Sequence, residues 1–273
     1  MEAQVKVEYR DGIRRFIFRQ SWMNTFQHCP EQARLDMHGL LPRVESDATA
    51  IGTSVHVGIE HLLDDAEPSE AWRLSCSKFD ELSELPEFAW LQVKTPATAH
   101  RIIYNALWGW YDEIEPKLGR TISVEQHFSL HVQTMPCGDE IWIEGTWDYE
   151  DEHGLWDWKT AGREYQPWEV ERWYVQPTQY TLAHSLINDC YPLPFNYAVM
   201  VKTGGEGPSK TQHLQVRRDE GHYKWLVRQM KNAVALYDMT DGGEHPWPLM
   251  DQGWHCSPKW CSAWSSCKGA YVS

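Results

Sequence analysis

Apolar residues recur at helical spacing in two parts of the chain. Between residues 97 and 117 they form a stripe typical of an amphipathic helix, made of Ala99, Ile102, Ile103, Ala106, Leu107 and Trp110. A second stripe follows residues 50–63 through Ile51, Val55, Ile59, Leu62 and Leu63. Thr53 or Ser54 lies near the start of this second predicted helix and is its expected cap.

The remaining pattern predicts strands and helices in mixed order. Predicted strands lie at about residues 123–133, 140–149, 154–160 and 195–202. Predicted helices lie at about residues 21–35, 177–187 and 219–237. The glycine-rich stretch 203–209 is the one expected flexible connection. We therefore expect a mixed α/β fold in a single domain over residues 1–273.

Two carboxylates and a lysine are expected to meet on neighbouring strands. Asp148 closes one predicted strand, and Asp157 and Lys159 lie on the next strand, after the acidic turn 150–154. Because side chains alternate along a strand, Asp157 and Lys159 share one face, opposite Trp156 and Trp158.

Oxygen ligands of this kind suit Mg²⁺ or Mn²⁺, which polarises a phosphoryl group and activates water. Lys159 would then orient or deprotonate that water, and Glu144 shares the face of Asp148 as a supporting residue. The alternative is an exposed surface pair on a hairpin, because the spacing of Asp157 and Lys159 alone is common.

A histidine on the predicted helix 50–63 offers a further ligand. His56 and Glu60 are four residues apart, so they lie on one helical face. Imidazole suits Mn²⁺ better than Mg²⁺. Glu60 would support His56 or contact DNA.

Four ordered motifs together resemble a known family. They are Gly52-Thr-x-x-His56-x-x-x-Glu60, Gly145-x-x-Asp148, Asp157-x-Lys159 and Gln176-x-x-x-Tyr180. Their order and separation resemble the RecB-type nucleases of the PD-(D/E)xK superfamily, over roughly residues 20–270. The resemblance implies a restriction-endonuclease-like central mixed sheet flanked by helices. It also implies that His56, Asp148 and Asp157 bind the metal and that Lys159 is catalytic.

Gln176 and Tyr180 would lie on a helix beside the active site in such a nuclease. Pro177 disfavours the helical conformation in the residue before it, so we expect Pro177 at the first helical position. Gln176 is then expected at the cap of that helix, and Gln176 and Tyr180 are candidate catalytic residues.

Cysteines are concentrated near the two ends of the chain. Cys29 lies near the start, and Cys256, Cys261 and Cys267 lie within the last eighteen residues. This arrangement resembles the iron–sulfur branch of RecB-type nucleases, including AddB-type and CRISPR-associated relatives. It implies a structural [4Fe–4S] cluster that joins the termini through residues of about 21–40 and 250–273.

The spacing of these cysteines leaves the cluster type open. Four residues separate Cys256 from Cys261, where that branch usually has two. Four thiolates also hold structural zinc, which is the main alternative. Disulfides are disfavoured because the seven cysteines are an odd number and the sequence has no secretory start. The other three cysteines are assigned no role.

Charge argues against extended DNA contacts, because the formal net charge is −14. Two basic stretches, 10–19 and 202–231, are the candidate phosphate-contacting surfaces. The individual candidates are Arg217, Arg218, Lys224 and Arg228. No apolar run approaches the length of a membrane span.

The sequence thus predicts a Mg²⁺- or Mn²⁺-dependent DNA exonuclease acting on single strands or strand ends, in recombination, repair or processing. We expect a cytoplasmic location in a bacterium or a phage-infected cell, and protein partners of a recombination or CRISPR type. One alternative is a catalytically inactive DNA-binding accessory protein stabilised by Fe–S or zinc. Another is an unrelated zinc-stabilised protein in which Asp157 and Lys159 only decorate the surface.

Overall fold

The computed structural model describes residues 5–42 and 44–272. Its centre is a seven-stranded mixed sheet in the order β1-β2-β4-β5-β6-β7, with β3 paired to β4 beside this path. The strands are β1 (Val5–Arg10), β2 (Ile13–Arg19), β3 (Thr121–Thr134), β4 (Glu140–Asp151), β5 (Gly154–Ala161), β6 (Phe195–Val201) and β7 (Thr211–Val216).

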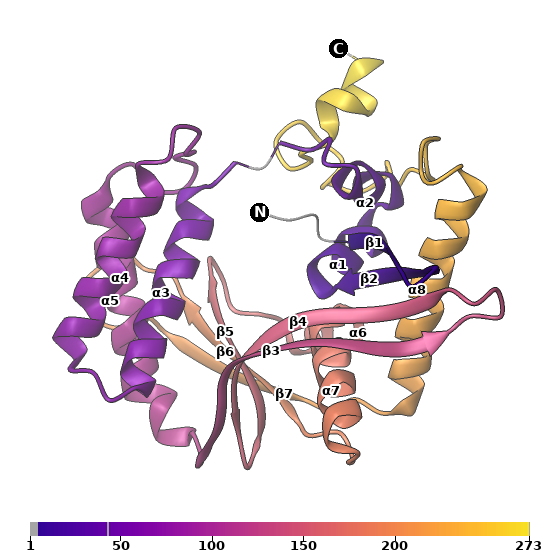
Figure 1. The fold of residues 1–273 in the computed structure, drawn as a ribbon. Helices are drawn as coiled ribbons and strands as arrows, with labels where there is room; N and C mark the ends of the chain where they lie inside the picture. The colour runs from indigo at the N-terminus through magenta and orange to yellow at the C-terminus, as the bar shows by residue number, and fades with distance from the viewer. Residues whose placement is uncertain (1–4, 43, 273) are drawn as a thin grey trace.

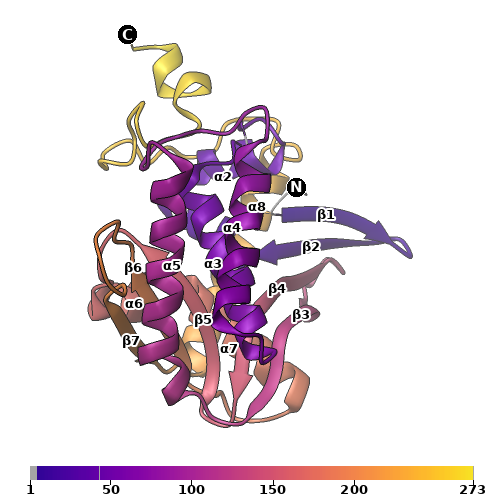
Figure 2. The same ribbon diagram turned by 90° about the vertical axis from the view of Figure 1, so that its left-hand side faces the viewer.

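Helices cover both faces of this sheet, as the sequence predicts (Figure 1). One group is formed by α3 (Asp47–Leu63), α4 (Pro68–Ser83) and α5 (Pro96–Glu113). The other group is formed by α1 (Gln20–His28), α2 (Pro30–Met37), α6 (Pro167–Trp173), α7 (Val175–Asn188) and α8 (Glu220–Met239). Figure 2 shows α3, α4 and α5 side by side, with the β1–β2 hairpin projecting away from them. Short 3₁₀ turns follow at Glu115–Lys117, Trp264–Ser266 and Lys268–Ala270.

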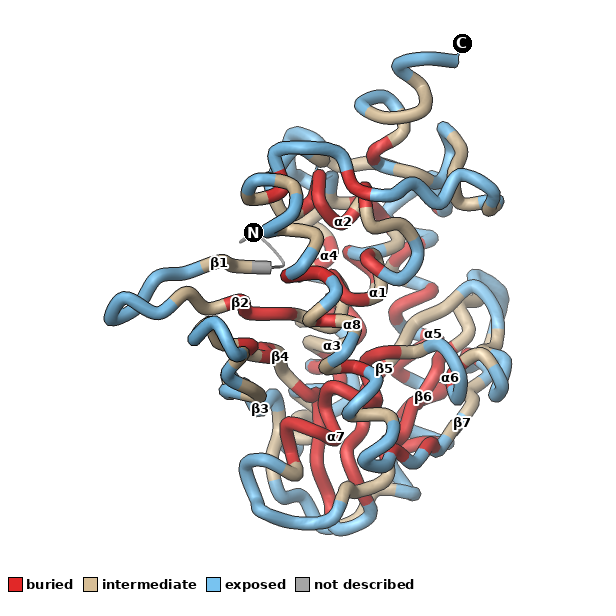
Figure 3. Tube along the Cα trace, turned by 90° about the vertical axis from the view of Figure 1, so that its right-hand side faces the viewer, coloured by how far each residue is buried: buried red, intermediate tan, exposed pale blue. Residues whose placement is uncertain are grey.

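Two apolar cores hold the layers together. Trp110, Trp156 and Trp158 are buried in the core between the sheet and α3 and α5. Trp22 and Trp147 are buried in the core on the side of α1, α7 and α8. Figure 3 shows the buried chain running through β5, β6 and α7, whereas the C-terminal segment is largely exposed. Many of the sixteen tryptophans therefore supply the apolar area that keeps these layers packed.

Helix α3 begins earlier than predicted, and the apolar stripe predicted for α5 is buried. Helix α3 begins at Asp47, because the Ser46 side chain accepts from the Thr49 amide in a capping box. The prediction that Thr53 or Ser54 caps it is wrong, since Ser54 is buried and donates to the carbonyl of Ala50 at 2.7 Å. The predicted stripe of α5 is correct, because all six of its apolar residues are buried.

The predicted helix over 21–35 is two helices. Cys29 has an extended backbone, with φ −158° and ψ 105°, between α1 and α2. Pro30 follows it at the first position of α2, and a residue before proline avoids the helical region. Cys29 is therefore presented at a break between two helices.

Several elements have no counterpart in the sequence prediction. They are β1, β2, β7, α4 and α6. Helix α4 lies in an acidic part of the chain. The connection 203–209 is tied down, because the Asn105 side chain donates to the carbonyls of Thr203 at 3.0 Å and Gly205 at 2.9 Å.

The N-terminal helices and the C-terminal segment lie side by side (Figure 1). Glu31 accepts from the Trp247 amide at 2.6 Å, and Arg34 donates to the carbonyl of Gly243 at 2.9 Å. The rings of Trp22 and Trp247 are 6.3 Å apart. Among the described residues, no helix combines the length and apolar content needed to cross a membrane.

Candidate active site

Strand β4 changes partners along its length, and this change opens the site. Its first half pairs with β2 in parallel, from Glu140 to Glu144. Its last residues pair with β5 only over Tyr149–Asp151, opposite Gly154–Trp156. Asp148 therefore lies where β5 separates from β4, and the register puts Asp157 next to it. At this fork the Trp158 amide donates to Oδ2 of Asp148 at 2.7 Å instead of to a β4 carbonyl.

His56 reaches the fork from α3. Its Nε2 lies 2.7 Å from the Trp158 carbonyl oxygen, and its Nδ1 lies 3.5 Å from Oδ2 of Asp148. A carbonyl only accepts, so Nε2 carries the proton. Burial first, and then the charge of Lys159, lowers the pKa of His56, which keeps the ring neutral. The Nδ1 lone pair therefore faces a carboxylate, an arrangement that a cation between them would stabilise.

Glu125 completes this group and was not predicted from the sequence. Ligand atoms of His56, Glu125 and Asp148 all lie within 4.8 Å of one another. Glu125 sits on β3 between the pairs Val124–Tyr149 and Gln126–Trp147, opposite Asp148. Its φ of +48° is unusual for a residue other than glycine. It is the only acid in β3, but sequence alone does not give the register that sets it across from Asp148.

Both acids of this group resist ionisation. Burial, and then the nearby Asp157, raises the pKa of Asp148 well above its ordinary value. One side of Glu125 is exposed to solvent. Burial of its other side, and then the charge of Asp148, raise the pKa of Glu125 to about 7. Two carboxylates held this close repel each other when both are charged, which favours a bound proton or a bound cation.

Asp157 and Lys159 form a buried ion pair beside this group. Nζ of Lys159 lies 2.6 Å from Oδ2 of Asp157, whose side chain is almost fully buried. Burial lowers the pKa of Lys159, but the charges of Asp157 and Asp148 outweigh it, so the net shift is upward and the ammonium is retained. The predicted faces are correct: Trp156 and Trp158 lie in the core, whereas Asp157 faces α7.

Gln176 lies beside Asp157, and the expectation that it caps α7 is wrong, because the cap is Tyr174. Helix α7 begins at Val175, two residues before Pro177, and places Gln176 in its first turn. Proline is tolerated there because first-turn amides have no partner within the helix. The Gln176 amide donates to Oδ1 of Asp157, and the Tyr197 hydroxyl donates to Oε1 of Gln176 at 3.2 Å.

Tyr180 lies one turn further along α7 and is also buried. It packs over Gly145, where an added Cβ would come within 3.0 Å of Tyr180 Cε1 and 2.8 Å of Phe128 Cζ. The glycine of the Gly145-x-x-Asp148 motif thus makes room for the tyrosine of the Gln176-x-x-x-Tyr180 motif.

The two supporting acids occupy different places. Glu60 is exposed and lies near enough to Glu125 to help raise its pKa. Among the described residues His56 takes its polar contacts from Trp158 and Asp148, so Glu60 is not its hydrogen-bond partner. Glu144 is buried and pairs with Arg19.

The basic stretch 10–19 is not a free phosphate-contacting surface. Arg14 pairs with Asp139 and Asp238, and Arg15 pairs with Glu140 at 2.8 Å. Arg19 pairs with Glu144. The pairs of Arg15 with Glu140 and of Arg19 with Glu144 follow from the parallel register of β2 and β4, which sequence charge counts do not contain.

The basic candidates of the second stretch are also partly engaged. Arg218 is buried, and Lys224 pairs with Glu220 at 2.9 Å on the exposed face of α8. Arg217 and Arg228 are exposed and remain predicted DNA contacts.

The four predicted cluster cysteines line one cavity of about 170 Å³. Cys29 comes from the break between α1 and α2, and Cys256, Cys261 and Cys267 come from the C-terminal segment. All seven cysteines are free thiols. Burial raises the pKa of Cys261 and of Cys267, and the neighbouring thiols raise it further. The cavity therefore gathers sulfur ligands from both ends of the chain.

Comparison with known proteins gives a family match and similarity in fold, but no similar curated protein. Residues 20–268 match the family model of the PD-(D/E)XK nuclease superfamily. No curated protein shows significant sequence similarity. A crystal structure from Eubacterium rectale, described as a "Putative exonuclease", is similar in fold with a TM-score of 0.51 and 14% identity. That similarity covers 87% of this chain and 86% of the other.

Proposed function

The chain belongs to the PD-(D/E)XK nuclease superfamily, and from this membership we propose that it is a metal-dependent deoxyribonuclease that degrades DNA from strand ends. One observation carries the proposal: the Nδ1 lone pair of His56 faces the Asp148 carboxylate, with Glu125 close to both. The charged pair Asp157 and Lys159 stands beside them. A hard cation and a phosphate fit between these groups.

The donor set fits Mg²⁺ or Mn²⁺. His56 and Asp148 would hold the ion, with Glu125 as a third ligand and Asp157 as the further carboxylate that the motif assigns. One nitrogen beside carboxylate oxygens favours Mn²⁺. When bound, the ion polarises the phosphoryl group and lowers the pKa of bound water.

The residues of the chain position the other participants. Lys159 stays protonated, so we assign it to orienting the attacking water and to balancing the negative charge that develops on the phosphate. Asp157 holds the ammonium, Gln176 holds Asp157, and Tyr197 holds Gln176. This chain of contacts fixes Lys159 before substrate arrives, which lowers the cost of ordering it in the reaction.

The preference for strand ends rests on the motif resemblance and on the described exonuclease with a similar fold. Digestion of end-labelled single- and double-stranded DNA, with Mg²⁺, Mn²⁺ or EDTA, tests it. We expect metal-dependent loss of the labelled terminus before the strand interior is cut. Binding without cleavage under all conditions would favour the inactive accessory protein instead.

We also propose that the four-cysteine cavity holds a [4Fe–4S] cluster. Among the described residues, no three of its sulfur atoms lie within 4.8 Å of one another. Tetrahedral zinc, with Zn–S bonds of about 2.3 Å, needs sulfur atoms roughly 3.8 Å apart. The wider spacing and the cavity between the thiols favour the larger inorganic group.

Recombination or repair is the expected cellular setting.

A further inference from the structure

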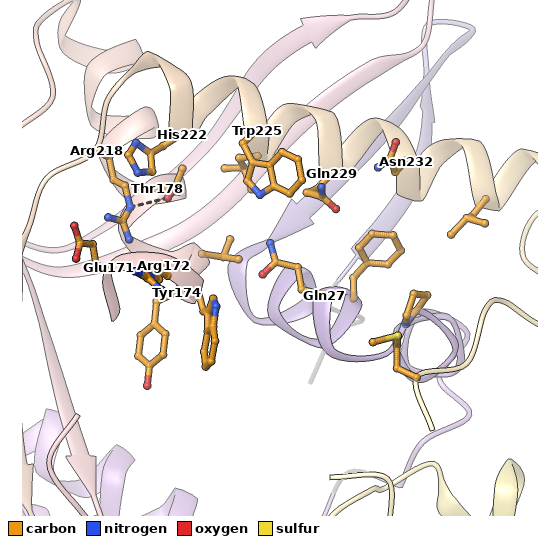
Figure 4. A pocket seen from close by; sticks show the side chains of 17 residues that line it. Gln27, Glu171, Arg172, Tyr174, Thr178, Arg218, His222, Trp225, Gln229 and Asn232 are labelled. Atoms are coloured by element: carbon orange, nitrogen blue, oxygen red, sulfur yellow. Dashed lines mark hydrogen bonds between the residues drawn. The ribbon is translucent and has the colours of Figure 1, made fainter. Parts of the chain in front are cut away.

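A groove of about 560 Å³ lies between α6 and α8, outside the metal site. We call it the α6–α8 groove. Figure 4 shows His222, Trp225, Gln229 and Asn232 following one another along α8, with Gln27 facing them from α1. Glu171, Arg172 and Tyr174 close one end. The volume is in the range of small-molecule sites.

Two tryptophans in this groove are exposed although both are large and apolar. Trp173 is 59% exposed and Trp225 is 56% exposed. The described part of the chain leaves these two rings largely uncovered. The aromatic side chains of the two cores, in contrast, are buried. Exposed indole faces are stacking platforms for unpaired bases of any sequence.

The polar lining has the charge that a phosphate backbone requires. Arg172 and Arg218 line the groove, and Glu171 is its single carboxylate. This local balance is positive in a chain whose formal net charge is −14. The amides of Gln27, Gln229 and Asn232 add donors and acceptors that suit base edges.

Arg218 is the most unusual of these groups. It is only 6% exposed, and its guanidinium donates to Thr178 Oγ1 at 3.0 Å and to the carbonyl oxygens of Val170 at 2.9 Å and Arg217 at 3.3 Å. Within residues 5–42 and 44–272 no carboxylate forms an ion pair with it. A buried charge satisfied only by neutral acceptors is stabilised when an anion approaches.

The groove is connected to the active site through Tyr174. This residue lines the groove, and its ring lies 6.0 Å from that of Tyr197. Tyr197 donates to Gln176, which in turn holds Asp157. Tyr174 therefore lies between the groove and the side chains that hold Asp157.

We propose that the α6–α8 groove binds the unpaired nucleotides of single-stranded DNA next to the phosphate that is cut. Trp173 and Trp225 stack on the bases, and Arg172 and Arg218 attract the phosphates. A duplex is excluded from this contact because its bases stack on one another. The inference rests on the proposed nuclease function, but its test measures binding without cleavage.

The test uses the full-length protein in EDTA with fluorescently labelled dT20. Trp173→Ala and Trp225→Ala are each expected to weaken binding about tenfold, as loss of a stacking platform does. Arg172→Gln should reduce the salt dependence of binding. Trp108→Ala is the matched control, because this tryptophan is 39% exposed on α5, away from the groove. Melting curves check that each variant is folded.

The outcomes separate the groove from the nuclease assignment. If the wild type binds dT20, both tryptophan variants weaken that binding, and no DNA is cut with Mn²⁺, the groove proposal holds and the nuclease proposal fails. If the double variant Trp173→Ala/Trp225→Ala binds dT20 as tightly as the wild type, the groove proposal is overturned and the groove is left to another occupant, such as an apolar protein segment. Equal weakening by Trp108→Ala would also overturn it.

Discussion

Glu125 lies opposite Asp148 across strands β3 and β4, and its φ is +48°. A residue other than glycine in this conformation costs about 1 kcal/mol or more. Such backbone strain is common at functional sites, where the surrounding structure holds a residue in an unfavourable conformation.

Glu125→Gly should separate strain from function. We expect the metal-free variant to be more stable by about 1 kcal/mol, a rise in Tm of a few degrees for a chain of this size. We also expect Mn²⁺ affinity to fall about tenfold or more. Calorimetry with and without Mn²⁺ measures the stability and the metal affinity. Glu60→Gly, at the exposed acid near Glu125, is the comparison. A variant that loses stability and keeps its metal affinity contradicts the assignment.

Lys159→Ala should lower kcat about 10²–10³-fold, which is the usual loss when one transition-state donor is removed. Its Mn²⁺ affinity should be retained, because Lys159 donates no lone pair to the ion. Asp148→Asn should instead abolish Mn²⁺ binding together with cleavage. Lys78→Ala, on α4 far from the site, is the control. Wild-type cleavage rates in Lys159→Ala or Asp157→Ala would reject the active-site assignment.

The metal-free protein should lose stability as the pH rises through neutrality. Folding raises the pKa of Glu125 from 4.5 to about 7, so the folded state holds a proton that the unfolded state releases. The free energy of unfolding therefore falls between these two pH values, and Asp148 acts in the same direction. Melting in EDTA from about pH 5 to pH 8 should show this slope. Glu125→Gln should flatten it, and an unchanged slope would disprove the role of Glu125.

Anaerobically purified protein should be brown and should contain iron and acid-labile sulfide. Cys261→Ser should lose the colour, and the Tm should fall by roughly 10 °C or more, because the cluster closes a loop of more than two hundred residues worth about 5 kcal/mol. Cys137→Ser, at an exposed thiol outside the cavity, should change neither. Colourless protein with stoichiometric zinc would replace the iron–sulfur proposal with a zinc site.

Gly145→Ala should destabilise the fold by about 1–3 kcal/mol, because the new methyl group meets both Phe128 and Tyr180. Gly162→Ala is the matched control, since nothing lies within 4 Å of its added Cβ. Chemical denaturation of the two variants gives the difference. Equal stabilities would mean that Tyr180 moves aside without cost.

The motif residues could be predicted because their signals are local. Helical spacing places His56 on α3, and strand alternation puts Asp157 and Lys159 on one face. Glu125 could not be found this way, since its role depends on the register between β3 and β4. Sequence patterns contain alternation, but they do not contain the pairing of distant strands.

Charge and helix ends show the same limit. A count of bases in 10–19 suggests a DNA surface, but β2 pairs with β4 and each of Arg14, Arg15 and Arg19 meets an acid. Pro177 suggests that Gln176 is outside α7, but a first-turn proline leaves room for two earlier helical residues. The ion pairs depend on the pairing of distant strands, and the helix start depends on where the first turn of α7 is placed.

Trp158, between Asp157 and Lys159, serves the site through its peptide groups alone. Its N–H holds Asp148 and its C=O holds His56, while its indole is buried against Trp110 and Tyr149. The residue between Asp157 and Lys159 therefore contributes its backbone groups to the site and its side chain to the core. A substitution here would act through the backbone, because a side chain that does not fit the core would shift the contacts to both Asp148 and His56.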